Sequence, residues 1–150
     1  MFRIFEEYAK LTFILAMIIV GVIFYVSSIP HDPVPGIGFK YKAIIYHAGI
    51  FFFLCLFLMM ALSKGIKKDW IFFAVLLSVF YGITDELHQH FVPGRSVSVG
   101  DFLIDSLGVF CALTVYLISL DERKNYSHKR ALSQKQTQQQ TQQQTSDHET

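Results

Sequence analysis

The chain alternates between long apolar stretches and short polar ones. Four stretches each hold about 20 predominantly apolar residues, the length that an α-helix needs to cross about 30 Å of hydrocarbon. They cover residues 11–29, 43–62, 70–91 and 101–120. Each is continuously apolar and does not alternate with a period of two, which disfavours a β-barrel. The pattern predicts an all-α fold, a bundle of four transmembrane helices.

The composition supports a membrane protein. Of the 150 residues, 52% are hydrophobic and 17% are charged, which is too little charge to coat a soluble globule of this size. The formal net charge of +1 argues against a nucleic-acid partner, which would require a basic surface. Cys55 and Cys111 both lie in apolar stretches, where a thiol packs as a small hydrophobic group, so no disulfide is expected.

The distribution of Lys and Arg predicts the orientation of the chain in the membrane. Two precede the first predicted helix, two lie in residues 30–42, three in residues 63–69, one in residues 90–100, and five follow Leu120. With four spans, ten of these cations fall on one side and three on the other. The positive-inside rule then places both termini in the cytoplasm and the loop with Arg95 outside.

The C-terminal segment differs in composition from the rest. It is first basic and then almost entirely Gln, Thr and Ser, with a repeated Thr-Gln-Gln-Gln. Such a segment cannot bury a core, so we expect it to be disordered. The chain is therefore predicted to consist of a membrane domain over residues 1–122 and a disordered cytoplasmic tail over residues 123–150.

The strongest chemical signal lies in residues 84–105, where the third predicted helix runs through a short loop into the fourth. This stretch holds four carboxylates, two histidines and one arginine. A charged residue at the centre of a membrane helix costs about 2.5–3.5 kcal/mol, whereas one Leu or Ile returns only about 0.3–0.6. We therefore expect these acids near the outer interface, inside the bundle and close to a counter-charge.

Helical spacing predicts how the acids are arranged. Asp85 and Gln89 are one turn apart on one face, and Glu86 lies on the adjacent face. Asp101 and Asp105 form a second pair on the last helix. Because a short loop makes consecutive helices antiparallel neighbours, the two carboxylate pairs are expected to face each other at similar depth.

The loop between these helices carries its own signals. Pro93-Gly94 predicts a turn, and we expect Arg95 to lie over both carboxylate pairs as their counter-ion. Ser96 and Ser98 precede the last helix, whose free N–H groups favour an anion. The loop would suit a phosphate, and the carboxylates a metal ion, a proton or an amine. A zwitterionic headgroup, or a phosphate bridged by a divalent cation, would use both halves.

Several residues also have a structural explanation. Asp101 alone would serve as a helix-start cap, and Gly108 would permit close helix packing. His47 is either a hydrogen-bonding link between helices or a member of the site. His88 and His90 are expected to be solvated, and their spacing is poor for a shared zinc ion. For the cluster as a whole, a purely structural role is disfavoured because buried ion pairs stabilise little.

On these residues the chain resembles the VanZ-like family of small membrane proteins, named for a glycopeptide-resistance accessory protein associated with teicoplanin. The matching runs are Asp85-Glu86-x-x-Gln89, Phe91-Val92-Pro93-Gly94-Arg95-Ser96, Asp101-x-x-x-Asp105 and Gly108. The wider likeness covers about residues 10–120 and includes His47, although Ile50 and Phe51 follow where the family often has Glu or Tyr. Asp105 stands where the family often has Asn. The resemblance implies a multi-pass plasma-membrane protein and, for a narrow part of the family, antibiotic resistance.

Three functions remain open at this point. We rank first a binding or accessory protein that engages a lipid or envelope-precursor headgroup at the outer leaflet and affects teicoplanin susceptibility. Its predicted ligand-binding residues are His47, Asp85, Glu86, Gln89, Arg95, Ser96, Asp101 and Asp105.

The second function is an enzyme that acts on a lipid-linked phosphate with the help of a divalent cation. Its catalytic candidates are Asp85, Glu86 and Asp105, and the same residues with Asp101 are the metal-ligand candidates. No nucleophile motif supports it. The third is a proton-coupled transporter, because carboxylates within a membrane can relay protons. With only four spans, such a transporter would need a homodimer.

Overall fold

The computed structural model describes residues 8–30, 37–63, 68–95 and 98–148. Within these ranges the chain forms four α-helices and no strand. The helices are α2 (Ala9–Ser27), α3 (Ile37–Ser63), α4 (Lys68–His90) and α5 (Val99–His148).

The four predicted spans are confirmed. Segments long and apolar enough to cross a membrane cover Ala9–Ser27, Ala43–Leu62, Asp69–His90 and Val99–Gln139. Their ends differ from the predicted ones by at most two residues, except at the C-terminal end of the last span. The all-α fold follows from the continuous apolar runs, since only a helix satisfies its own backbone groups within lipid.

The last helix is longer than the apolar pattern requires. Where the sequence predicts a disordered tail, the structure continues α5 to His148. Side chains from Asp121 to Gln139 are exposed apart from the half-buried Arg123, so this segment buries no core, as its composition predicts. Gln, Lys, Arg and Ala have good helix propensity, which explains the helical backbone. An exposed polar helix is only marginally stable in water, and disorder in solution stays a prediction.

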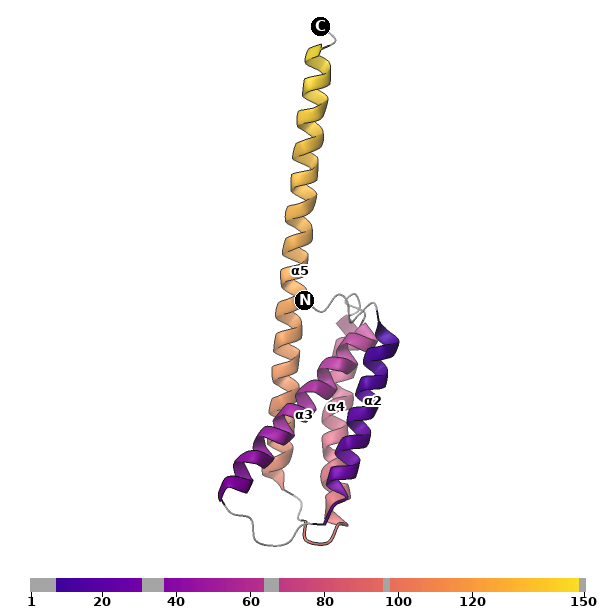
Figure 1. The fold of residues 1–150 in the computed structure, drawn as a ribbon, viewed down its shortest axis with the longest axis vertical. Helices are drawn as coiled ribbons and strands as arrows, with labels where there is room; N and C mark the ends of the chain where they lie inside the picture. Colours follow the sequence, from indigo (N-terminus) through magenta and orange to yellow (C-terminus); the bar gives the residue numbers. More distant parts are fainter. Residues whose placement is uncertain (1–7, 31–36, 64–67, 96–97, 149–150) are drawn as a thin grey trace. The chain divides into compact units, whose positions relative to one another are not determined.

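Residues up to Tyr116 form one compact unit, and residues from Leu117 onward form a second. In the first unit α2 packs on α3, and α4 packs on both. Successive helices run in opposite directions (Figure 1), so α2 and α4 end where α3 and α5 begin. We call this the Arg95 end of the bundle, and the opposite end, where α2 begins, the Lys10 end.

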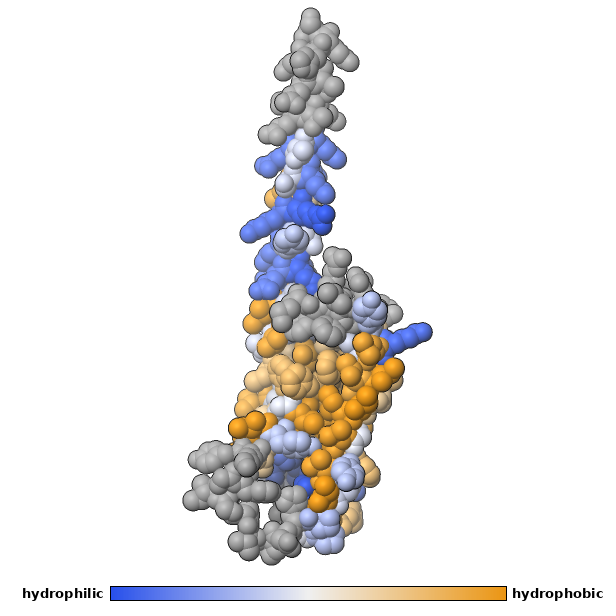
Figure 2. All heavy atoms as spheres, viewed as in Figure 1, coloured by the Kyte–Doolittle hydropathy of each residue, from blue (hydrophilic) through white to orange (hydrophobic). Residues whose placement is uncertain are grey.

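The buried core of this unit is narrow, and its outer surface is apolar. Leu54, Cys55 and Met59 of α3 are almost fully buried. Large side chains such as Phe72 and Phe80 of α4 are exposed. Figure 2 shows apolar residues covering much of the visible face of the first unit. An apolar exterior over a thin core is expected of a bundle whose surrounding solvent is lipid.

Two close approaches fix the position of α5 against its neighbours. A Cβ added at Gly108 would overlap the backbone carbonyl of Ala48 on α3, so only glycine fits there. A Cβ added at Gly82 of α4 would lie 3.8 Å from both Asp105 Cβ and the Phe102 ring. The first contact agrees with the predicted packing role of Gly108. Together they place Asp105 where α3, α4 and α5 meet.

Candidate ligand-binding site

The buried acidic residues of α4 lie in its last two turns, at the Arg95 end. Asp85, Glu86 and Gln89 are only 3–5% exposed, and Asp105 of α5 is 1% exposed. These are side chains that normally remain in water, because burying them is costly unless they find partners. Their partners therefore define what the cluster does in the fold and what it leaves open.

The predicted turn follows α4 directly. The N–H of Arg95 donates to the carbonyl oxygen of Val92 at 3.1 Å, and Gly94 has φ of 79°. Proline at the second position and a positive φ at the third are the signature of a type II turn. The turn reverses the chain within four residues and brings Arg95 back toward the end of α2.

Arg95 does not act as the counter-ion that the sequence predicts. Its guanidinium donates to the carbonyl oxygens of Val26 at 2.7 Å and Ile29 at 3.2 Å, and to Gln89 Oε1 at 3.1 Å. In the described part of the chain it forms no ion pair with a carboxylate. The physical reason is that the last carbonyls of a helix lack intrahelical partners and attract a cation. Arg95 thus caps α2.

Gln89 connects this cap to the acids. Its Nε2 donates to Asp85 Oδ2 at 2.8 Å and more weakly to Ser27 Oγ at 3.4 Å, while its Oε1 accepts from Arg95. The i, i+4 pairing of Asp85 and Gln89 is the one that helical spacing predicts. The amide is fixed in one orientation because its two ends have partners of opposite character. Asp85 therefore faces the α2 side of the bundle.

Glu86 faces the other side, toward the start of α5. The backbone N–H of Ser98 donates to Glu86 Oε2 at 2.9 Å, and Ser98 Oγ accepts the N–H of Asp101 at 3.2 Å. Ser98 is thus the N-cap of α5, the role that the sequence suggests for Asp101. A carboxylate held at a helix N-terminus is stabilised by the helix dipole.

His47 joins α3 to the cluster. Its Nδ1 lies 3.0 Å from Asp105 Oδ1, and its side chain is 12% exposed. One proton lies between the two atoms, so the contact is a charge-assisted hydrogen bond across helices. The two alternatives for His47 are therefore compatible, since a link between α3 and α5 also places it among the acids.

Antiparallel pairing of α4 and α5 brings the carboxylates to similar depth. Asp105 lies opposite Gly82, and one turn further along α4 Glu86 reaches the first turn of α5, where Asp101 stands. Glu86 interacts electrostatically with Asp85, Asp101 and Asp105. The four acids that the sequence singles out thus belong to one cluster.

Part of this cluster is unsatisfied. Within the described residues, the buried side-chain atoms without a hydrogen-bond partner include Tyr46 Oη, Glu86 Oε1, Asp105 Oδ2 and Ser106 Oγ, the last on the residue that follows Asp105. Tyr46 of α3 interacts electrostatically with Asp85 and Asp105. Buried polar atoms without partners are rare and costly, so these atoms require an explanation.

The other predicted residues lie outside the cluster. His88 shares a hydrogen bond of 2.9 Å with Ser28 Oγ and stacks on Phe24, which differs from the solvated side chain that the sequence predicts. His90 is exposed, as predicted. Ser96 lies outside the described residues. No three of the described His, Cys, Asp or Glu side chains are arranged to hold a metal ion, and the metal ligands stay a prediction.

Two contributors were not among the predicted site residues. Tyr46 is adjacent to His47, and in the sequence it is one of many aromatic residues of an apolar stretch. Ser27 ends α2 and gains its role only through Gln89, from a distant segment. A signal for Tyr46 was available, because a hydroxyl beside a histidine in a membrane helix is a polar pair.

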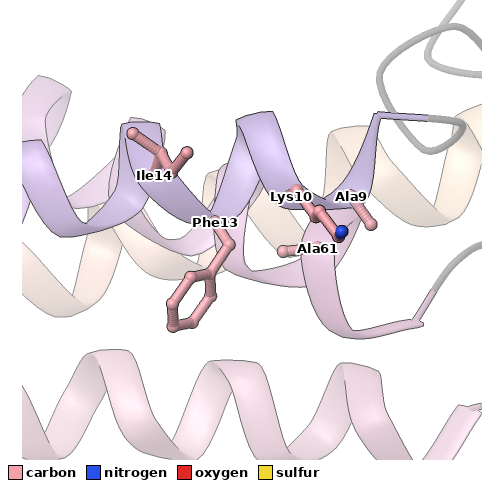
Figure 3. A pocket seen from close by; sticks show the side chains of 5 residues that line it. All are labelled: Ala9, Lys10, Phe13, Ile14 and Ala61. Carbon is pink, nitrogen blue, oxygen red and sulfur yellow. The ribbon is translucent and has the colours of Figure 1, made fainter.

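A pocket of about 420 Å³ opens at the Lys10 end of the bundle. It lies between α2 and α3 (Figure 3) and is lined by Ala9, Lys10, Phe13, Ile14 and Ala61. No carboxylate lines it. The hollow is apolar apart from Lys10 and lies at the opposite end of the bundle from the acids.

The fold and the site define a polytopic protein with four membrane-spanning helices and a buried acidic cluster near one end. The model of the VanZ/LLP1 family matches residues 12–120, which include the whole cluster from His47 to Asp105. The chain belongs to this VanZ-like family, in agreement with the resemblance of its motifs. Comparisons with curated proteins and with solved structures give no significant match.

Proposed function

We propose that this protein binds the headgroup of a lipid or a lipid-linked envelope precursor at the outer leaflet, without turning it over. The observation that carries the proposal is the burial of carboxylates from α4 and α5 together at one end of the bundle. Ionisable side chains inside a membrane are costly, so those that occur there generally have a function. The end of a span is also the depth at which headgroups lie.

The orientation is part of the proposal. Ten of the thirteen Lys and Arg residues fall on the side of the chain termini, which favours an outward Arg95 end in the plasma membrane. Replacing Cys111, the exposed cysteine, with Ser and then introducing Val99→Cys or Ser133→Cys gives two reporters. A membrane-impermeant maleimide added to whole cells is expected to label the first reporter and not the second. The reverse pattern would refute the orientation.

The cluster has the form of a prepared binding site. Gln89 holds Asp85, the N-terminus of α5 holds Glu86, and His47 holds Asp105. Each carboxylate is fixed through one oxygen, so little side-chain entropy remains to be lost on binding. Rigid side chains on helices present a ligand with a fixed arrangement of charges.

Native mass spectrometry of the protein purified in mild detergent tests the binding role. Wild type is expected to retain lipid or lipid-linked molecules above the level found for Glu86→Gln. Asp69→Asn is the matched control, because Asp69 is an exposed acid in the first turn of α4, at the other end of the bundle. If wild type and Glu86→Gln retain the same molecules in equal amounts, the proposed function is wrong.

The effect on teicoplanin is tested separately. An amphiphilic glycopeptide acts in the same outer zone, so occupancy of the site would change its access to membrane-bound targets. Expression in a teicoplanin-susceptible Gram-positive host is expected to raise the inhibitory concentration for wild type and not for Glu86→Gln. An unchanged inhibitory concentration for wild type would refute this part alone. Catalysis on a lipid-linked phosphate and proton-coupled transport stay predictions that no observation favours over binding.

A further inference from the structure

We infer that the group bound by the acidic cluster is a protonated amine, presented by a phospholipid or by a lipid-linked precursor. This inference rests on the proposed function and specifies the chemistry of its ligand. It follows from which atoms of the cluster already have partners and which do not.

The unpartnered atoms near the acids are mainly hydrogen-bond acceptors. Glu86 Oε1 and Asp105 Oδ2 are carboxylate oxygens on side chains 5% and 1% exposed, and neither has a partner in the described part of the chain. Tyr46 Oη, also unpartnered, can accept as well as donate. A ligand that donates hydrogen bonds would suit these acceptors, whereas a phosphate would add further acceptors.

Among the side chains that the structure describes, neither Arg95 nor His47 pairs with all of the acids. Arg95 is bound to the end of α2 and to Gln89, so it is not available for the phosphate that the loop sequence suggests. His47 contributes one shared proton to Asp105 Oδ1. Among the described side chains, the carboxylates where α3, α4 and α5 meet thus outnumber the cations that pair with them, and a cation would complement them.

The described side chains limit which kind of cation the cluster can bind. An ammonium group has three N–H donors and no acceptor, so it can donate to carboxylate oxygens such as Glu86 Oε1 and Asp105 Oδ2. No three described His, Cys, Asp or Glu side chains are arranged as ligands of one metal ion. A primary amine at the end of a flexible headgroup therefore suits this set of atoms better than a divalent cation.

Four lipid probes of equal chain length test the inference with the purified full-length protein. Phosphatidylethanolamine carries phosphate and amine, its N-acetylated derivative and phosphatidylglycerol carry phosphate without amine, and a lipidated lysine peptide carries amine without phosphate. Affinity is measured by titration with native mass spectrometry, with and without Mg²⁺. The two amine probes are expected to bind at least about tenfold more tightly than the other two, independently of Mg²⁺.

Variants of the acids test whether the preference for amine probes arises at the acidic cluster. Glu86→Gln and Asp105→Asn are each expected to lower amine affinity about tenfold, whereas Asp69→Asn keeps it. If Asp105→Asn does not fold, Glu86→Gln alone carries the test. A preference for phosphatidylethanolamine over the lipidated lysine peptide would favour a phospholipid as the source of the amine, and the reverse a precursor.

The outcomes separate the two proposals. Equal binding of phosphatidylethanolamine and its N-acetylated derivative would overturn the amine inference and leave headgroup binding in place. Tighter binding of phosphatidylglycerol that appears only with Mg²⁺ would do the same and would point to a phosphate bridged by the metal. Absence of binding by all four probes, together with equal retention of native lipids by wild type and Glu86→Gln, would overturn both.

Discussion

Replacing Gly108 with Ala is expected to weaken the whole bundle. The new Cβ would overlap the Ala48 carbonyl oxygen and would lie 3.0 Å from its carbon and 3.1 Å from its Cα. Backbone atoms cannot rotate away, so α5 must move off α3, and the 3.0 Å contact of His47 with Asp105 lengthens. Overpacking costs about 1–3 kcal/mol and a weakened buried hydrogen bond about 1 kcal/mol, so we expect about 2–4 kcal/mol in total.

Reversible unfolding in detergent, followed by helical circular dichroism, measures this free energy. Gly49→Ala is the matched control, because it lies one residue from the contact and a Cβ there meets nothing within 4 Å. It should leave stability unchanged or raise it by up to about 1 kcal/mol, because Ala has the higher helix propensity. Gly82→Ala should be nearly neutral, since its Cβ would lie 3.4 Å from the Phe51 ring, an ordinary contact. Equal stability of Gly108→Ala and Gly49→Ala would refute the close packing of α3 and α5.

Three further predictions concern the links at the Arg95 end, each measured by the same unfolding assay. Ser98→Ala should cost about 0.5–2 kcal/mol through loss of the α5 cap, and Ser98→Asn should restore most of it; no difference between them would refute the cap. Gly94→Ala should cost about 1–2 kcal/mol because φ is 79°, and a neutral result would contradict the turn. His47→Ala should lower the free energy of unfolding by about 3–5 kcal/mol, because it leaves Asp105 buried and unpaired. This loss should be smaller when Asp105→Leu is also present. Additive losses in the double variant would show that His47 and Asp105 are not coupled.

Much of the fold was predictable because membrane spans depend on local sequence. The length and the continuous apolar character of the spans gave the four helices, since within lipid only a helix or a closed barrel satisfies the backbone polar groups and a barrel requires alternation. The turn at Pro93-Gly94 was also predictable from the local sequence, because Pro93 restricts its own φ and Gly94 can adopt the positive φ of the turn. The pairing of Asp85 with Gln89 required only helical spacing.

The partners between helices were less predictable. Arg95 was expected above the acids because opposite charges attract, but its guanidinium donates to carbonyls at the end of α2, about 70 residues earlier in the chain. Nothing in the local pattern shows that these carbonyls lie beside the turn. Likewise, both Ser98 and Asp101 suit a helix start, and the choice between them depends on where α5 begins.

The difference between the two sides of the cluster explains how one motif can serve both folding and binding. Toward α2, Arg95, Gln89 and the helix-end carbonyls satisfy one another, and this side is structural. Toward α3 and α5, Glu86 and Asp105 each use one oxygen for the fold, and the other has no partner among the residues that the structure describes. A cluster retained only for packing would gain by satisfying both oxygens, because a half-satisfied buried network is worse than an apolar core. A ligand that donates hydrogen bonds on this side would therefore offset the free energy cost of burying the two carboxylate oxygens.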